Sequence, residues 1–123
     1  MSRILVVDDS ETVLNFLRTI LENEQYEVAT ATNGNDGLAQ AHQSLPDLVV
    51  TDSIMPGLDG FGLLRALRSD PATEAVPVIM LTSGAADDPD HIAREPQPDA
   101  FVRKSADLTP LLAEIRAALE RIR

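Results

Sequence analysis

The stretch Ile4-Leu5-Val6-Val7-Asp8-Asp9-Ser10 places four apolar residues directly before two aspartates. An unbroken apolar run of this length is typical of a strand that is buried on both faces, as in a parallel sheet. Three further apolar runs, at 48–50, 78–81 and 100–102, end within two residues of Asp52, Thr82 and Lys104. Each run therefore leads into a residue that can take part in chemistry. Lys104 is also the only lysine of the chain.

Helical patterns alternate with these apolar runs along the chain. Apolar residues at helical spacing, turn residues and prolines mark where each helix begins and ends. The predicted helices are 11–24, 38–44 after a turn at 33–37, 61–69, a short one at 90–95, and a last one capped by Asp107 or Thr109. A further strand is expected at 28–31. The fourth helix is expected to be short because Pro96 and Pro98 follow it.

Strict alternation of strand and helix predicts the fold class. Five such units form an α/β domain, a (βα)5 doubly wound five-stranded parallel sheet with helices on both faces. Right-handed crossovers place the loops that follow the strands at one edge of the sheet, where open α/β folds bind ligands. We expect a single domain over residues 1–123, with no output domain in this chain.

The composition of the chain argues against several classes of partner and location. The net charge is −10, so direct binding to nucleic acid or to an anionic membrane surface is disfavoured by repulsion. The chain has no cysteine, which is consistent with a reducing compartment. No apolar stretch approaches the roughly 20 residues that span a bilayer, and no leader segment precedes the first strand. The expected location is the cytoplasm.

Asp8, Asp9 and Asp52 would crowd together at the shared edge of the sheet. Carboxylates at close range repel each other unless they share a proton or a cation. An all-oxygen donor set suits Mg²⁺, which commonly binds one or two carboxylates together with a phosphate oxygen. Lys104 and Thr82 would add a positive charge and a hydrogen-bond donor, as phosphoryl transfer requires. Zinc is disfavoured because the chain's histidines, His42 and His91, lie away from this edge and cysteine is absent.

Each of these residues also has an ordinary structural explanation. Asp9 or Ser10 alone is more typical of a helix cap, Thr82 of a strand-end hydroxyl, and Lys104 of a solvated edge. Asp52 resists this explanation because the next helix begins about eight residues later. The combination of all of them, in this order, favours one shared phosphoryl site with a carboxylate as nucleophile.

The chain resembles the receiver domains of two-component response regulators, which have a flavodoxin-like fold, over essentially its whole length. The resemblance is carried by four stretches, which are Ile4 to Ser10, Asp52-Ser53-Ile54-Met55-Pro56-Gly57-Leu58-Asp59-Gly60, Val78 to Gly84, and Asp99 to Lys104. It implies that Asp52 is the phosphoacceptor and that Asp8, Asp9, Asp52 and the Ile54 backbone carbonyl hold Mg²⁺. Thr82 and Lys104 would bind the phosphoryl oxygens, and Thr82 and Phe101 would form the switch.

The resemblance implies a phosphorylation-dependent signalling switch and not an enzyme with a substrate of its own. A histidine kinase or a histidine phosphotransfer protein would supply the phosphoryl group, and the domain would assist its own phosphorylation and dephosphorylation. An unknown downstream protein would bind the face formed by the fourth helix, fifth strand and fifth helix. Ser105 stands where the family usually has proline, so the backbone beside Lys104 is expected to differ from that of the family. The 95–99 segment replaces a glycine-alanine turn, so the fourth helix and its signalling face are expected to be remodelled.

Two other functions compete with the switch. The first is a pseudo-receiver that binds a protein without phosphorylation; loss of an acidic residue, Thr82 or Lys104 would favour it, but all are present. The second is a magnesium-dependent phosphatase with Asp52 as nucleophile. It is disfavoured because Ile54 stands where a second acid or base would be needed, and because no glycine-rich phosphate loop is present.

Overall fold

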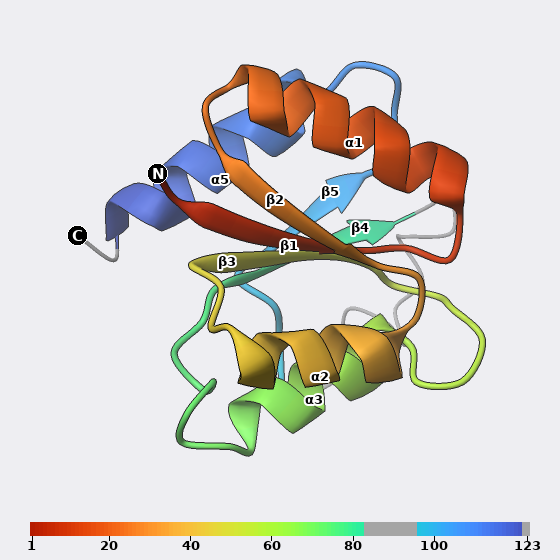
Figure 1. The fold of residues 1–123 in the computed structure, drawn as a ribbon, viewed down its shortest axis with the longest axis vertical. Helices are drawn as coiled ribbons and strands as arrows, with labels where there is room; N and C mark the ends of the chain where they lie inside the picture. Colours follow the sequence, from red (N-terminus) through yellow and green to blue (C-terminus); the bar gives the residue numbers. More distant parts are fainter. Residues whose placement is uncertain (83–95, 122–123) are drawn as a thin grey trace.

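A five-stranded parallel sheet forms the centre of the molecule (Figure 1). The computed structural model describes residues 1–82 and 96–121. The strands are β1 (Arg3–Val7), β2 (Glu27–Ala31), β3 (Leu48–Asp52), β4 (Val78–Thr82) and β5 (Ala100–Arg103), in the spatial order β2-β1-β3-β4-β5. All neighbouring pairs are parallel. The order reverses beside β1, so β1 and β3 border the position where such sheets bind ligands.

The helices cover both faces of the sheet, as the alternating pattern predicts. They are α1 (Glu11–Asn23), α2 (Gly34–Gln43), α3 (Gly60–Arg68) and α5 (Thr109–Arg121). Helices α1 and α5 lie on one face, and α2 and α3 lie on the other (Figure 1). The short helix predicted at 90–95 lies outside the described residues. No helix in the described ranges has both the length and the apolar character needed to cross a membrane.

Two buried clusters, one on each face, form the core. The cluster under α1 and α5 includes Ile4, Val6, Val50 and Val102, and the cluster under α2 and α3 includes Leu5, Val7, Val49 and Met80. Alternate residues of each strand therefore enter opposite clusters, as the pleat of a sheet requires. The strands β1, β3 and β4 are almost fully buried, which explains why the sequence shows continuous apolar runs there.

The start of α2 differs from the prediction. The helix begins at Gly34, not at residue 38, and the Asn33 side chain accepts a hydrogen bond from the Asp36 amide at its N-terminus. The two glycines of this segment serve close packing inside the helix and not a turn. A Cβ atom on Gly34 would lie 2.2 Å from the Leu58 carbonyl oxygen, and one on Gly37 would lie 2.9 Å from the Val7 side chain.

The final helix agrees more closely with the prediction. Asp107 accepts a hydrogen bond from the Thr109 amide at 3.0 Å, and α5 begins at Thr109. Its buried residues include Leu111 and Ile115, two members of the predicted apolar stripe. Leu119 of the same stripe is also buried, whereas Leu108 and Leu112 are only partly buried. Ile122, the last residue of the predicted stripe, lies outside the described residues.

Candidate functional site

Strand alternation brings Asp8, Asp52 and Lys104 to the same face of the sheet. Asp8 continues the alternate positions of β1 that face α1 and α5, and Asp52 and Lys104 do the same for β3 and β5. Lys104 follows the last residue of β5, and its amide donates to the Thr82 carbonyl at 2.7 Å, which extends the pairing with β4. The backbone therefore holds all three side chains at the carboxyl edge of the sheet.

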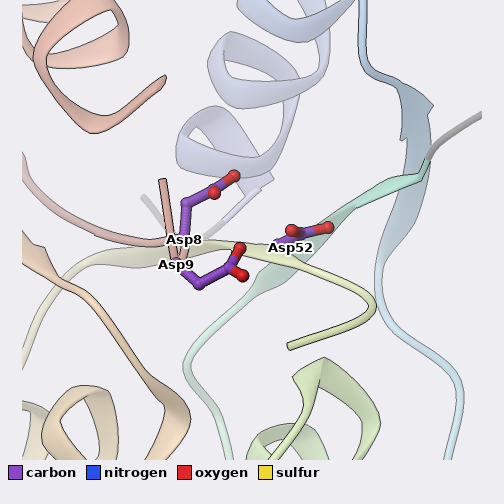
Figure 2. Close-up of side chains that lie close together, drawn as sticks. All are labelled: Asp8, Asp9 and Asp52. Carbon is purple, nitrogen blue, oxygen red and sulfur yellow. The ribbon is translucent and has the colours of Figure 1, made fainter. Parts of the chain in front are cut away.

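The three predicted metal-binding carboxylates lie together. One oxygen from each of Asp8, Asp9 and Asp52 lies within 4.8 Å of the others (Figure 2). Asp8 is fully buried, Asp52 is 8% exposed, and Asp9 is exposed to solvent. The cluster is thus open to solvent on the side of Asp9. Its donor atoms are all carboxylate oxygens, which are the ligands that Mg²⁺ prefers.

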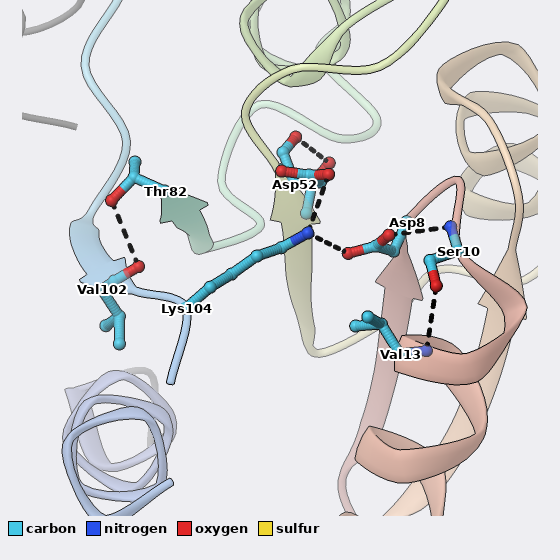
Figure 3. Close-up of polar contacts among 8 residues, drawn as sticks. Asp8, Ser10, Val13, Asp52, Thr82, Val102 and Lys104 are labelled. Atoms are coloured by element: carbon cyan, nitrogen blue, oxygen red, sulfur yellow. Dashed lines mark hydrogen bonds and ion pairs between the residues drawn. The ribbon is translucent and has the colours of Figure 1, made fainter. Parts of the chain in front are cut away.

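The ammonium group of Lys104 bridges two of these carboxylates. Lys104 Nζ lies 2.8 Å from Asp8 Oδ2 and 3.0 Å from Asp52 Oδ2 (Figure 3). Asp8 Oδ2 is buried from solvent, and this ion pair supplies its counter-charge. The only lysine of the chain is therefore the internal cation of the acidic cluster.

Burial and charge shift the pKa values of this group of residues. Desolvation raises the pKa of Asp52, and the neighbouring Asp8 carboxylate raises it further. Lys104 and a hydrogen bond from the Ile54 backbone lower this pKa, but the net shift is upward. Burial by itself would lower the pKa of Lys104, but the carboxylates of Asp8 and Asp52 outweigh it and raise the pKa. The site therefore favours a cation beside Asp52.

Local hydrogen bonds fix the residues around the cluster. Asp8 Oδ1 accepts from the Ser10 amide at 2.9 Å, and the Ser10 hydroxyl accepts from the Val13 amide as the N-cap of α1. Ser10 is thus the helix cap, which leaves Asp9 outside that role. On the other side, Gly60 packs against the main chain of Asp52, where a Cβ atom would lie 2.2 Å from the Asp52 carbonyl oxygen.

Thr82 lies near this edge but does not contact the carboxylates. Thr82 continues the alternate positions of β4 that face α2 and α3, so it is on the face opposite to Lys104. Its hydroxyl lies 3.5 Å from the Val102 carbonyl oxygen, on the side away from Asp52 (Figure 3). Phe101 shares the face of Thr82 and is half-buried against the cluster under α3.

The structure thus brings together some of the predicted site residues and separates others. Asp8, Asp9, Asp52 and Lys104 form one group, whereas Thr82 and Phe101 lie on the other face of the sheet edge. The side chain of Ile54 is 57% exposed beside the group. His42 pairs with Asp70 at 2.7 Å, and His91 lies outside the described residues.

Sequence reasoning did not single out Phe61, the second residue of α3. Its ring packs against Phe101, with the ring centroids 6.3 Å apart. The only signal in the sequence is an aromatic residue directly after Gly60, and that position alone does not distinguish a core residue from a partner of Phe101.

The comparisons with known proteins agree with this geometry. The family model of the response regulator receiver domain matches residues 4–116. Protein PilH of Pseudomonas aeruginosa is 40% identical over 119 residues, which cover 97% of this chain and 98% of PilH. Several other curated relatives are longer proteins, and the chain spans between 18% and 54% of their length.

Solved structures share the fold over nearly the whole chain. A receiver domain of a signal transduction histidine kinase from Syntrophus aciditrophicus superposes with a TM-score of 0.92 at 31% identity, covering 100% of this chain and 93% of that one. The response regulator TrrA from Thermotoga maritima, solved in complex with Mg²⁺-BeF, gives 0.83 at 32% identity, covering 96% and 99%. The fold, the acidic cluster at the sheet edge and these matches together show that the chain belongs to the response regulator receiver domain family.

Proposed function

We propose that this chain is a phosphorylation-dependent signalling switch in which Asp52 accepts a phosphoryl group. The observation that carries the proposal is the Lys104 ammonium between Asp52 and Asp8, within a cluster of three carboxylates. This arrangement provides a nucleophile, a metal-binding donor set and a positive charge at one edge of the sheet. The pseudo-receiver alternative is not favoured, because every residue it would be expected to lose is present.

The donor would be a phosphohistidine on a histidine kinase or a histidine phosphotransfer protein. A carboxylate oxygen of Asp52 attacks the phosphorus, the new P–O bond forms as the P–N bond breaks, and the electron pair of that bond stays on the partner's imidazole. Lys104 then pairs with a phosphoryl oxygen in place of its contact to Asp52. Later attack of water on the same phosphorus would break the P–O bond to Asp52, restore the carboxylate and release inorganic phosphate, and the domain would assist this dephosphorylation.

The donor set at this edge fits Mg²⁺. Asp8, Asp9, Asp52 and the backbone carbonyl of Ile54 would hold the ion, and the all-oxygen set matches its preference. When bound, Mg²⁺ would neutralise the carboxylates and coordinate a phosphoryl oxygen. Lys104 must leave Asp8 for the ion to bind there, since the ammonium now contacts Asp8 Oδ2.

Phosphorylation would change the conformation through Thr82 and Phe101. The Thr82 hydroxyl would give up its hydrogen bond to the Val102 carbonyl and donate to a phosphoryl oxygen instead. Phe101 would then move into the space that Thr82 vacates. Because Phe101 lies in β5, the change would reach the face that includes β5 and α5. An unknown downstream protein would read that face; the fourth helix predicted to complete it lies outside the described residues.

The phosphodonor partner would approach from the open side of the acidic cluster. An apolar pocket of about 330 Å³ lies beside Lys104, between α1 and the loop before α5, and is lined in part by Phe16 and Leu108. The exposed side chains of Phe16 and Ile54 offer further apolar contact there. We propose that residues 1–123 act as one receiver domain, in the cytoplasm, without direct contact to nucleic acid or membrane.

Intact mass spectrometry tests this function. The protein is incubated with acetyl phosphate in the presence or absence of Mg²⁺, and Asp52→Ala is treated in the same way. The proposal predicts a gain of about 80 Da, one phosphoryl group, that requires both Mg²⁺ and Asp52. Absence of this adduct from folded, Mg²⁺-binding protein, even in rapidly quenched samples, would favour the pseudo-receiver.

A further inference from the structure

We infer that Thr51 is a positioning residue whose buried hydroxyl holds the main chain of Asp52 and thereby sets the turn that carries two of the proposed Mg²⁺ ligands. The inference deepens the proposed function and rests on it, because it assigns a further residue of β3 to the same site. Thr51 acts through Asp52 and not on the phosphoryl group itself.

Thr51 is a polar residue in an apolar part of the core. It is fully buried and continues the alternate positions of β3 that, like Val49, enter the cluster under α2 and α3. Valine has nearly the same shape and would fill this position without a hydroxyl. Burial of a hydroxyl costs free energy unless it is hydrogen-bonded. The partner of this hydroxyl is therefore the informative feature, and that partner is the Asp52 carbonyl.

The peptide group that follows Asp52 is held at both ends. At its oxygen, the Thr51 hydroxyl donates to the Asp52 carbonyl at 3.0 Å. At its nitrogen, the Ser53 amide donates to the Leu81 carbonyl of β4 at 2.9 Å. Gly60 also packs on the Asp52 carbonyl, where a Cβ atom would lie 2.2 Å from the oxygen. The plane of this peptide is thus fixed, and with it the direction in which the chain leaves β3.

This direction determines where the groups of Ile54 lie. The Ile54 backbone donates a hydrogen bond to the Asp52 carboxylate, and its carbonyl is one of the proposed Mg²⁺ ligands. The Lys104 ammonium contacts the same carboxylate at 3.0 Å (Figure 3). A rotation of the peptide after Asp52 would therefore displace both backbone groups of Ile54 and change how the carboxylate sits between its two donors.

Loss of the Thr51 hydroxyl should weaken Mg²⁺ binding and slow phosphorylation. The net free energy of one hydrogen bond in a folded protein corresponds to about a two- to tenfold change in an equilibrium constant. We therefore expect Thr51→Val to bind Mg²⁺ about two- to tenfold more weakly than the wild type. Its rate of phosphorylation by acetyl phosphate at saturating Mg²⁺ should fall by at least a similar factor, because the nucleophile is less precisely placed.

Two further variants separate positioning from packing. Thr51→Ser keeps the hydroxyl and should bind Mg²⁺ as the wild type does. The matched control is Thr73→Val, because Thr73 is also fully buried and its hydroxyl also donates to a backbone carbonyl, that of Leu67, at 2.8 Å. Thr73 lies in the connection from α3 to β4, at the opposite edge of the sheet. Its variant should lose stability but keep the wild-type Mg²⁺ affinity and phosphorylation rate.

A measurement on the metal-free protein gives a readout that does not depend on phosphorylation. Because Lys104 is the only lysine of the chain, lysine labelled with ¹³C at Cε gives a single NMR resonance, next to the ammonium that contacts Asp52. This resonance should shift in Thr51→Val and stay at its wild-type position in Thr51→Ser and in Thr73→Val.

The outcomes distinguish this inference from the proposed function. A folded wild type that binds Mg²⁺ but forms no adduct would overturn the proposed function, whatever the variants do. A wild-type Mg²⁺ affinity or an unshifted lysine resonance in Thr51→Val would overturn the inference alone. Equal losses in Thr51→Ser or in Thr73→Val would also overturn it, because packing would then explain them. If Thr51→Val does not fold, Thr51→Ala is compared with Thr51→Ser, since these two variants differ only by the hydroxyl oxygen.

Discussion

Replacement of Lys104 by methionine should strengthen Mg²⁺ binding while it slows phosphorylation. Methionine keeps an unbranched apolar side chain but removes the ammonium, which now lies 2.8 Å from Asp8 Oδ2 and 3.0 Å from Asp52 Oδ2. Mg²⁺ needs these carboxylates and must displace the ammonium from them. The variant therefore lacks both a competitor for the oxygen ligands and a positive charge that repels the incoming ion.

The distances set the size of the effect. Even at the dielectric constant of water, two unit charges at about 3 Å attract by about 1.4 kcal/mol, which corresponds to a factor of about ten in a binding constant. The buried position of Asp8 makes this a lower bound. Phosphorylation should instead slow by about 10² to 10³, the usual effect of removing one group that stabilises developing charge.

Calorimetric titration with Mg²⁺ at constant ionic strength measures the first effect, and the rate of adduct formation with acetyl phosphate measures the second. Arg116→Met is the matched control, because it removes one positive charge from α5 that pairs at 3.9 Å with Glu24 at the end of α1. The control should bind Mg²⁺ as the wild type does. Unchanged or weaker Mg²⁺ binding by Lys104→Met would refute the view that the ammonium competes for the metal site.

Three further predictions concern stability and can be checked by denaturant unfolding. Gln25→Gly should raise the free energy of unfolding by about 1 kcal/mol, because Gln25 has a φ of 71° directly after α1, a conformation that glycine adopts without strain; an unchanged midpoint would contradict this. Gly34→Ala should lower it by about 1–3 kcal/mol, since the added Cβ would meet the Leu58 carbonyl, and wild-type stability would show that α2 can shift. A hydrogen bond from the Ala72 amide lowers the pKa of Asp70, and the His42 side chain lowers it further. The ionised Asp70 side chain therefore stabilises the fold above pH 3.8, its ordinary pKa, and this contribution is lost as the pH falls through the lowered pKa. Asp70→Asn should therefore be less stable than the wild type at neutral pH and equal to it in strong acid, and a difference that does not depend on pH would argue against this titration.

The strand pattern was predictable because parallel strands buried on both faces leave continuous apolar runs in the sequence. The same runs located Asp8, Asp52 and Lys104, since a residue that directly follows a strand must lie at the sheet edge. The pattern did not show on which face of that edge each side chain lies. Thr82 was expected to converge with the carboxylates, but its place in the alternation of β4 directs it to the opposite face.

The predicted start of α2, at residue 38, was wrong because the two glycines before it were assigned to a turn. Glycine in a sequence indicates a turn or a close approach of two backbones, and local sequence does not separate these possibilities. Gly34 and Gly37 are required because α2 packs closely on the Leu58 carbonyl and on Val7. Both contacts join residues far apart in the sequence. The partnership of Phe61 with Phe101 is of the same kind, because it depends on how α3 packs against β5.

The central claim is that Asp52, and not Asp8 or Asp9, becomes phosphorylated. Borohydride reduces an aspartyl phosphate to homoserine, so treatment of the phosphorylated protein followed by peptide mass spectrometry identifies the modified residue. The structure favours Asp52 because it is partly accessible and contacts Lys104, whereas Asp8 is fully buried and Asp9 is not among the contacts of Lys104 at the described edge. We predict homoserine at position 52 only, formed only when Mg²⁺ was present. Homoserine at position 8 or 9, with Asp52 intact, would contradict the account.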